Sequence, residues 1–135
     1  MDLGNNVKIW QPEKSVILDC EIGDNSTIHA FVWIGNNVKI GKNCKIQAFA
    51  FLPDGVVLED NVFIGPHVCF CNDKRPPSGF WCKTLVKKGA SIGANATIIP
   101  GITIHEMAMI GAGSVVTKNV PECECWVGNP AKKKV

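Results

Sequence analysis

An apolar residue at every sixth position is the feature that most constrains how this sequence can fold. Between residues 34 and 46 the chain reads IGNNVKIGKNCKI, with isoleucines six apart. Apolar residues make up 46% of the chain, so apolar residues at all fifteen positions of the two runs given below would arise by chance only about once in 10⁵ sequences. The period fits neither a helix nor an ordinary strand. The series is Ile22, Ile28, Ile34, Ile40, Ile46, Leu52, Leu58, Ile64 and Phe70, then Val86, Ile92, Ile98, Ile104, Ile110 and Val116.

A compact residue follows four positions after each large one except Phe70. A six-residue unit with one large and one compact inward side chain describes a short strand and a corner. Three units make a triangular coil of about 18 residues, and stacked coils form a parallel β-helix. We therefore predict a single all-β domain, residues 1–135, with regular coils from about 16 to about 121 and a short C-terminal tail. The compact residues are Ser26, Val32, Val38, Cys44, Ala50, Val56, Val62 and Val68, then Ala90, Ala96, Ile102, Ala108, Ser114 and Val120.

The expected corners carry Asn or Gly in most units. These two residues accept a positive φ at the lowest cost, so we predict a left-handed residue at most corners. An ordinary β-sandwich with Asn and Gly turns would not keep one phase for so long. The corner residues are Asn25, Asn37, Asn43, Gly55, Asn61, Gly89, Asn95, Gly101, Gly113 and Asn119.

This pattern resembles the hexapeptide-repeat acyltransferases, and the resemblance runs from about Ile22 to Ala131. It implies a left-handed β-helix, although general connection rules favour right-handed crossovers. Three blocks, LEDNVFIGPHVCFCND, LVKKGASIGANATIIPGITI and IGAGSVVTKNVPECECWVGNPAKK, are similar to N-acetyltransferases that act on nucleotide-linked amino sugars. The nearest kinds acetylate the 3-amino group of dTDP-3-amino-3,6-dideoxyhexoses or of UDP-linked diamino uronic acids. The resemblance thus implies acetyl-CoA as co-substrate, a nucleotide-linked amino sugar as acceptor, and a role in polysaccharide biosynthesis.

Four corners carry neither Asn nor Gly, namely Phe31, Phe49, His67 and Met107. The first three are 18 residues apart, so they should stack on one edge. An exposed apolar stripe usually marks an interface, and the family resemblance implies a homotrimer with sites between subunits. The alternative is that the N-terminal segment folds over the stripe. Two further ladders should flank this edge: Trp33, Phe51 and Cys69, and His29, Gln47 and Gly65.

The period breaks between Phe70 and Val86, where the step is sixteen instead of six. The intervening RPPSG has the turn chemistry of a surface excursion, so we predict a loop that projects from the wall at about residues 71–85. Loops on a rigid wall commonly carry function.

One further unit could be hidden within this segment. Phe80 and Thr84 fit the phase of Val86, and the sequence leaves open whether they belong to the wall. If they do, Met107 joins the edge that contains Phe31.

The resemblance places Asn72 close to the reacting amine. An Asn amide can hold the nucleophile or polarise the thioester carbonyl, but it cannot take a proton at neutral pH. His67 is the candidate general base, because it should face outwards near Asn72 and an imidazole titrates near neutrality. A positioning or interface role for His67 is the alternative.

Further residues are candidate ligand contacts. Asp73 could bind a sugar hydroxyl or ammonium group, or it could only form a turn at the start of the loop. The resemblance places the cofactor along the C-terminal coils, where small residues allow close approach and lysines can neutralise phosphates. The predicted contacts are Asp73, Arg75, His29 and Trp33 for the substrate, and Gly93, Gly111, Ala112, Lys118, Pro130 and Lys132 for the cofactor.

Composition argues against several other functions. A net charge of +2 does not indicate a nucleic-acid partner, and no apolar run is long enough for a membrane span. Seven cysteines without a C-x-x-C pair, and no signal peptide, indicate reduced thiols in the cytoplasm. No metal is predicted, because His29, His67 and His105 would be stacked too far apart in one chain to share a zinc ion as in a carbonic anhydrase.

Two alternatives remain: an O-acetyltransferase with His67 as base, and a non-catalytic trimeric scaffold.

Overall fold

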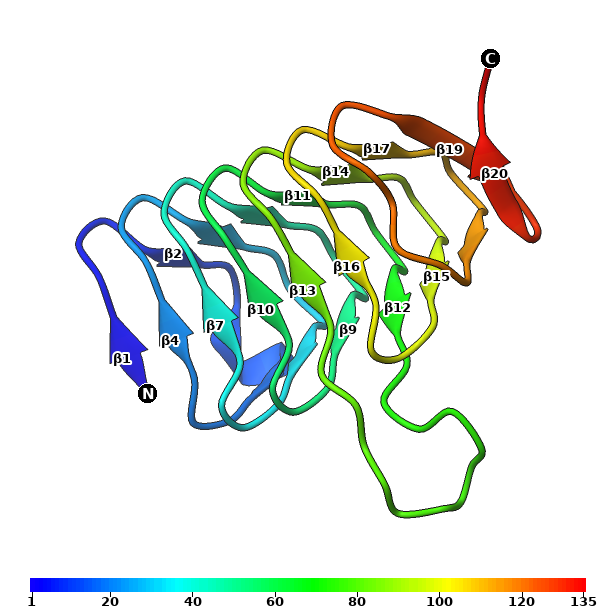
Figure 1. Ribbon diagram of the computed structural model, residues 1–135. Coiled ribbons are helices and arrows are strands. Elements are labelled where there is room, and N and C mark those ends of the chain that lie inside the picture. The colour runs from blue at the N-terminus through cyan, green and yellow to red at the C-terminus, as the bar shows by residue number, and fades with distance from the viewer.

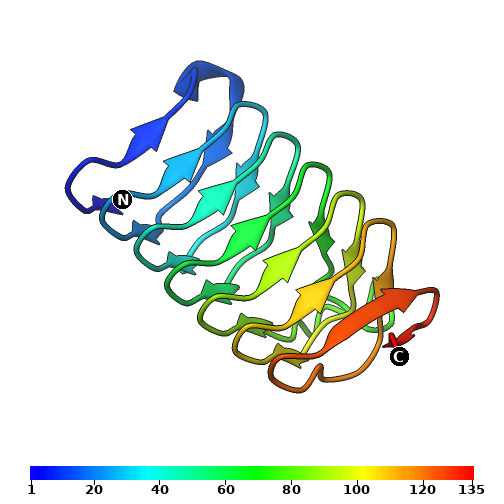
Figure 2. The ribbon, with the colours of Figure 1, turned by 90° about the horizontal axis from the view of Figure 1, so that it is seen from above.

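The structure, a computed structural model, describes residues 1–135 and forms a parallel β-solenoid with three walls (Figure 1). Nearly every strand is two residues long and pairs in parallel with a strand one coil away. Seen from above, the coils stack along one axis from the N-terminus to the C-terminus (Figure 2). The predicted fold, a left-handed parallel β-helix of six-residue units, is confirmed.

The three walls alternate along the chain. The first consists of β1 (Asp2–Leu3), β4 (Glu21–Ile22), β7 (Lys39–Ile40), β10 (Val57–Leu58), β13 (Leu85–Val86) and β16 (Thr103–Ile104). The second consists of β2 (Lys8–Ile9), β5 (Thr27–Ile28), β8 (Lys45–Ile46), β11 (Phe63–Ile64), β14 (Ser91–Ile92), β17 (Met109–Ile110), β19 (Cys125–Gly128) and β20 (Ala131–Lys133). The third consists of β3 (Val16–Ile17), β6 (Trp33–Ile34), β9 (Phe51–Leu52), β12 (Cys69–Phe70), β15 (Thr97–Ile98) and β18 (Val115–Val116). Each corner is named below by the two walls that it joins.

The core is the stack of inward residues that the period predicts. In the first wall, for example, Ile22 pairs with Ile40, which pairs with Leu58 in the next coil. Every predicted large and compact core residue is buried, with an exposed fraction of at most 8%. Burial of apolar area is the main stabilising term, so this column holds the coils together.

The corners are left-handed at nearly all predicted positions. The corner asparagines have φ between 57° and 61°, and even the exceptional corners Phe31, Phe49, His67 and Met107 have positive φ. Asn119 does not, so that prediction is wrong. Its side chain instead accepts a hydrogen bond from the Thr103 amide at 2.8 Å.

The first coil is less regular than the others. The short helix η1 (Pro12–Lys14) interrupts it, and Ile17 rather than Val16 pairs with the core residue Ile34. The step from Ile9 to the next inward residue is therefore eight residues instead of six. Strands also precede the predicted start of the coils, beginning with β1.

The C-terminal segment closes the far end of the second wall. β19 pairs in parallel with β17 and antiparallel with β20, so the predicted tail is a hairpin (Figure 1). No helix in the structure has the length and apolar content needed to cross a membrane.

The predicted loop leaves the third–first corner between β12 and β13 and projects away from the walls (Figure 1). Phe80 is 82% exposed and lies outside the wall, whereas Thr84 is buried at the compact position before Val86. The segment therefore contributes no additional unit. Met107 accordingly lies at the first–second corner beside Gly89, not on the edge of Phe31.

Candidate active site

The second–third corner carries a continuous aromatic stack. The rings of Phe31 and Phe49 are 5.1 Å apart and nearly parallel, and the imidazole of His67 stacks on Phe49 at 4.7 Å. An aromatic residue at positive φ is strained, so a role beyond turning the chain is indicated at these corners. The stack confirms the predicted edge.

The third wall extends this surface. Trp33 and Phe51 pack with ring centroids 6.2 Å apart and line an open hollow of about 380 Å³. Phe31 and Phe49 remain 46% and 50% exposed. Lys14 reaches the Phe31 ring at 5.6 Å, but the N-terminal segment does not cover the stack. The structure thus leaves an apolar surface at this edge.

The base of the projecting loop is a short antiparallel bridge. Asp73 pairs with Trp81, and the Cys82 amide donates to the Asn72 carbonyl oxygen at 2.8 Å. The side-chain amide of Asn72 is half-buried and makes no hydrogen bond within the chain. It is therefore free to contact a ligand.

Asp73 organises the loop. Its carboxylate accepts hydrogen bonds from the Arg75, Ser78 and Gly79 amides and from the Ser78 hydroxyl at 2.6 Å. The hydroxyl bond makes the largest contribution to lowering the pKa of Asp73. These contacts support the turn-forming role considered for Asp73. Its predicted contact with the substrate stays a prediction.

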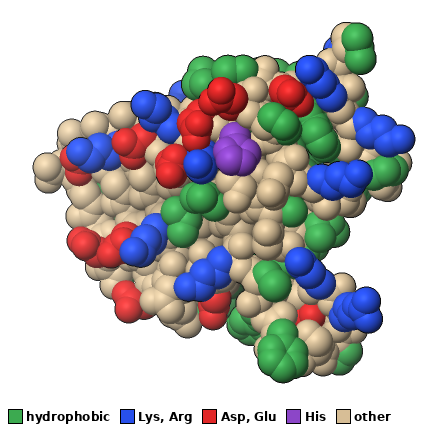
Figure 3. Space-filling model, viewed as in Figure 1, with side chains coloured by type: hydrophobic (Ala, Val, Ile, Leu, Met, Phe, Trp, Pro, Cys, Tyr) green, Lys and Arg blue, Asp and Glu red, His purple; other side chains and the backbone are tan.

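The loop itself presents cations and aromatic rings. Lys74, Arg75 and Lys83 are exposed and take part in no ion pair. Lys and Arg side chains, in blue, lie among hydrophobic side chains, in green, on the loop at the lower right of Figure 3. Such a surface suits a ligand with anionic and planar parts.

The two predicted catalytic residues do not meet within one chain. His67 precedes β12 at the second–third corner, whereas Asn72 follows it at the third–first corner. Five extended residues span roughly 16 Å. Any site that uses both side chains must therefore bring together two copies.

The other predicted contacts divide between the same two corners. His29, Trp33, Gly93 and Gly111 lie along the second–third edge with Ala112, while Lys118 follows β18 at the third–first corner. Pro130 and Lys132 lie on the terminal hairpin. The structure thus brings only part of the predicted cofactor set together.

Coil packing explains the two predicted cofactor glycines. A Cβ at Gly93 would lie 2.7 Å from the Ala112 amide nitrogen, and one at Gly111 would lie 2.6 Å from the Val127 side chain. Stacking alone therefore requires glycine here.

Cys69, three residues before Asn72, is not an activated nucleophile. Burial, followed by the influence of Cys71, raises the pKa of Cys69. A raised pKa favours the neutral thiol, which is the unreactive form.

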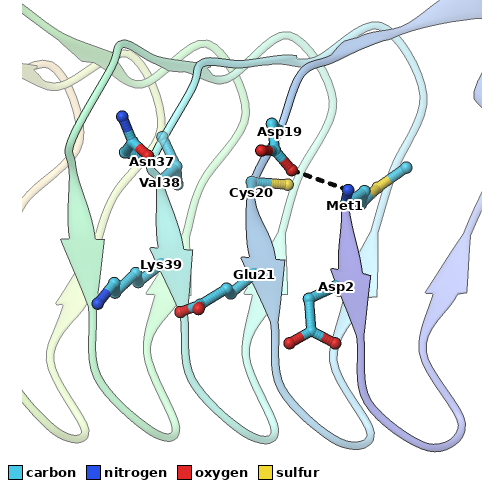
Figure 4. A pocket seen from close by; sticks show the side chains of 8 residues that line it. All are labelled: Met1, Asp2, Asp19, Cys20, Glu21, Asn37, Val38 and Lys39. Carbon is cyan, nitrogen blue, oxygen red and sulfur yellow. Dashed lines mark hydrogen bonds and ion pairs between the residues drawn. The ribbon is translucent and has the colours of Figure 1, made fainter.

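A hollow of about 260 Å³ at the N-terminal end of the first wall is lined from β1, β4 and β7 (Figure 4). The Met1 ammonium group bonds to Asp19 at 2.8 Å, which raises the pKa of the ammonium and lowers that of Asp19. The hollow thus holds the start of the chain, and no predicted site residue lies in it.

A second, smaller pocket was missed in the sequence. It has a volume of about 130 Å³ and lies at the third–first corner under the loop. Asp54 lies 18 residues before Asn72, the length of one coil, so the sequence could place these two residues at one corner but not the loop residues beside them. The lining residues are Asn37, Asp54, Gly55, Trp81, Cys82 and Lys83.

Comparison with known proteins supports this architecture. Residues 37–72 and 83–118 match the family described as bacterial transferase hexapeptide (six repeats). The chain belongs to this family. The matched segments end and restart on either side of the projecting loop, so the loop is an insertion in the family's repeat pattern.

Relatives in this family include bifunctional and single-activity enzymes. The chain is 34% identical over 144 residues to the bifunctional protein GlmU of Thermotoga petrophila, which covers 94% of this chain and 31% of that protein. It is 58% identical over 52 residues to a dTDP-3-amino-3,6-dideoxy-alpha-D-galactopyranose 3-N-acetyltransferase of Aneurinibacillus thermoaerophilus, which covers 38% of this chain and 27% of that one. The chain thus spans only about a third of the curated relatives that it matches.

Solved structures of family members superpose on nearly the whole chain. A variant of AntD, an N-acyltransferase from Bacillus cereus in complex with dTDP and coenzyme A, has a TM-score of 0.87 at 26% identity and covers 98% of this chain and 82% of that one. A variant of GDP-perosamine N-acetyltransferase from Caulobacter crescentus, with CoA and GDP-perosamine, has a TM-score of 0.82 at 25% identity, with coverage of 96% and 57%.

Proposed function

We propose that this chain transfers the acetyl group of acetyl-CoA to the amino group of a nucleotide-linked amino sugar. The observation that carries the proposal is the likeness, over 98% of the chain, to an N-acyltransferase bound to dTDP and coenzyme A. The segment 58% identical to a dTDP-amino-sugar N-acetyltransferase supports the same substrate class.

The residues at the loop base fit direct attack by an amine. Acetyl-CoA, when bound, supplies an activated acyl group as a thioester. The unpaired amide of Asn72 can hold the amine or donate to the carbonyl oxygen as negative charge develops there. No covalent intermediate on the chain is needed, in keeping with the raised pKa of Cys69.

The C-terminal coils fit the slender arm of the cofactor. Gly93 and Gly111 are half-buried and Ala112 is exposed, so a thin chain with amide groups can lie against small residues on these coils. The nearby hairpin carries Lys132 and Lys133, which are exposed and can neutralise phosphates.

The complete site lies between copies in this proposal. Asn72 and His67 occupy different corners, so a site with both needs the loop corner of one copy beside the aromatic edge of the next. A ring of three copies provides this arrangement at every contact and buries the Phe31–Phe49 stack. The exposed aromatic edge supports this assembly.

The test is a panel of nucleotide-linked amino sugars incubated with acetyl-CoA, with release of free thiol followed over time. We expect turnover with at least one amino sugar and none with the corresponding sugar that carries a hydroxyl in place of the amine. Turnover of the hydroxyl sugar alone would instead show an O-acetyltransferase. Binding of CoA without any turnover would contradict both activities.

A further inference from the structure

The first–second corner carries a patch of four sulfur side chains near the C-terminal end of the solenoid. Met107 and Met109 belong to one coil, and Cys123 and Cys125 belong to the coil above it. The proposed acetyl-transfer site uses the other two corners, at the loop and at the aromatic edge. The proposed function therefore leaves these four residues without a role.

A short last coil brings the two pairs into register. This coil closes two residues sooner than the coils below it, so Cys125 pairs with Met109 in the second wall. The Cys123 amide bonds to the Glu106 carbonyl oxygen at 2.9 Å, which places Cys123 above Met107. A coil of ordinary length would have set Cys125 above Met107 instead. The stack of two methionines under two cysteines is therefore visible only in the structure.

The equivalent positions at the second–third corner share one hollow. There, the corner residues Phe31 and Phe49 and the outward residues Trp33 and Phe51 come from two adjacent coils and line the same open space of about 380 Å³. The four sulfur residues occupy the same positions in their own coils, a left-handed corner residue and the outward residue two places later. Their side chains therefore gather over one patch of surface.

The patch is open to solvent. Met107 and Met109 are 60% and 55% exposed, Cys123 is exposed, and Cys125 is half-buried. Both cysteines are free thiols. Met107 and Cys123 have φ of 59° and 60°, a conformation that Asn or Gly adopts at most other corners. A residue that is costly at such a corner indicates a role for its side chain.

Thiolate and thioether sulfur atoms are soft ligands, and together they select monovalent copper. A metal–sulfur bond is about 2.3 Å long, so an ion held between two sulfur atoms joins atoms about 4.6 Å apart, close to the roughly 4.8 Å between coils. The Met107 sulfur lies against Gly89 in the coil below, and its unbranched side chain can turn this sulfur toward an ion. One ion can thus be held between a pair of ligands from each coil.

Harder metal ions lack a suitable set of ligands at this corner. No group of three or more His, Cys, Asp or Glu side chains in the structure is placed to hold a metal ion. Any site here must therefore use the methionines, and a thioether is not among the usual ligands of zinc. The surrounding charge favours a cation, because Glu122 is exposed and takes part in no ion pair.

We infer that Met107, Met109, Cys123 and Cys125 bind one monovalent copper ion at the first–second corner. The two cysteines ligate as thiolates, so each thiol releases a proton to water as the ion binds. The ion keeps its oxidation state, and no other reactant is needed. The absence of a metal predicted from the histidine spacing concerned zinc, whereas this site takes a softer ion and does not depend on the proposed function.

The test is an anaerobic titration of the reduced full chain with Cu(I) in competition with a colorimetric Cu(I) chelator, beside a titration with Zn(II). We expect one tight Cu(I) site per chain, with Zn(II) bound at least about 100-fold more weakly. The double variant Cys123→Asn/Cys125→Ser should weaken Cu(I) binding at least about 100-fold, and Met107→Asn/Met109→Ser at least about tenfold. Asn and Ser occupy the same positions in lower coils, so both variants should keep the fold, which circular dichroism checks.

Cys69→Ser/Cys71→Ser is the matched control, because it removes the other C-x-C pair, whose strand β12 lies beside Phe51 and Thr97 instead of methionines. The tight site should persist in this variant. Three results would overturn the inference: no tight Cu(I) site, wild-type affinity in either variant of the sulfur corner, or an equal loss in the control. X-ray absorption at the copper edge of the wild-type complex gives a second readout, in which ligation by sulfur alone supports the site and ligation by nitrogen or oxygen overturns it.

Discussion

The projecting loop divides the solenoid into two halves with the same interior and different exteriors. Ile46 in the N-terminal half and Ile92 in the C-terminal half are equally buried in the second wall. At the second–third corner, by contrast, Phe49 of the N-terminal half corresponds to Asn95 of the C-terminal half, one stacked on aromatic rings and the other exposed. The identity of the interior residues is therefore set by the fold, and that of the exterior residues by what each half contacts.

The third wall shows the same division. Its outward residues are Trp33, Phe51 and Cys69 before the loop, and Thr97 and Val115 after it, all in one paired register. Nothing in the backbone geometry requires this change, because the strands are equally long on both sides. A contact surface confined to the N-terminal half accounts for it.

The largest expected effect comes from charging the aromatic edge. Phe49→Asp should convert the proposed ring of three copies to monomers and lower activity at least about 100-fold, because a desolvated carboxylate would have no partner in such an interface. Asp also tolerates the left-handed corner, so each chain should stay folded. Light scattering and the thiol-release assay measure the two outcomes.

Asn95→Asp is the control for this variant, since it adds the same charge at the same corner beyond the loop. It should leave mass and activity near wild type. A fully active Phe49→Asp monomer would refute the placement of the site between copies.

Truncating a buried side chain should lower the stability of the two halves by a similar amount. Ile46→Ala and Ile92→Ala each remove a fully buried side chain from the second wall, and each should lower the free energy of unfolding by about 2–5 kcal/mol. Urea unfolding in the Phe49→Asp background measures this without a contribution from assembly. A difference between the two variants of more than about 2 kcal/mol would mean that the halves are not equivalent inside.

Asn72 lies at the boundary between the halves, where we expect a substitution to change catalysis and not stability. Asn72→Ala should lower kcat/KM about thirtyfold, which corresponds to about 2 kcal/mol in the barrier, with mass and thermal stability unchanged. Wild-type turnover in this variant would show that the reacting centre has been misplaced.

The sequence predicted the interior almost completely, because a buried position repeats with the coil and tolerates only a few residue types. Ile46 and Cys44 could be assigned from period alone, and both are buried. Irregular elements were less predictable. The helix η1 shifts the inward position to Ile17. Asn119 does not form a left-handed corner, and its side chain accepts a hydrogen bond from a backbone amide instead.

The pocket under the loop could not be found from the period, because it combines a loop with two lower coils. Asp54 and Asn37 look like ordinary corner residues until the exit point of the loop is known. The aromatic edge, in contrast, was visible as corners that break the Asn and Gly rule. Deviations from a repeat can be seen in a sequence, whereas contacts between a repeat and an insertion require coordinates.

The smallest expected effect comes from replacing His67, the last corner residue of the aromatic edge, with the residue found one coil above it. His67→Asn introduces the residue found at Asn95, which accepts the φ of 61° readily, and removes only the stack on Phe49. If the amine attacks without a base from this chain, kcat/KM should fall less than about tenfold, equivalent to less than about 1.4 kcal/mol. A hydroxyl acceptor would depend on a base, so complete loss of activity would favour O-acetyl transfer with His67 in that role. The pH profile of the variant separates the two cases, because replacing an essential base changes the pH dependence of the rate, whereas replacing a positioning residue leaves it unchanged.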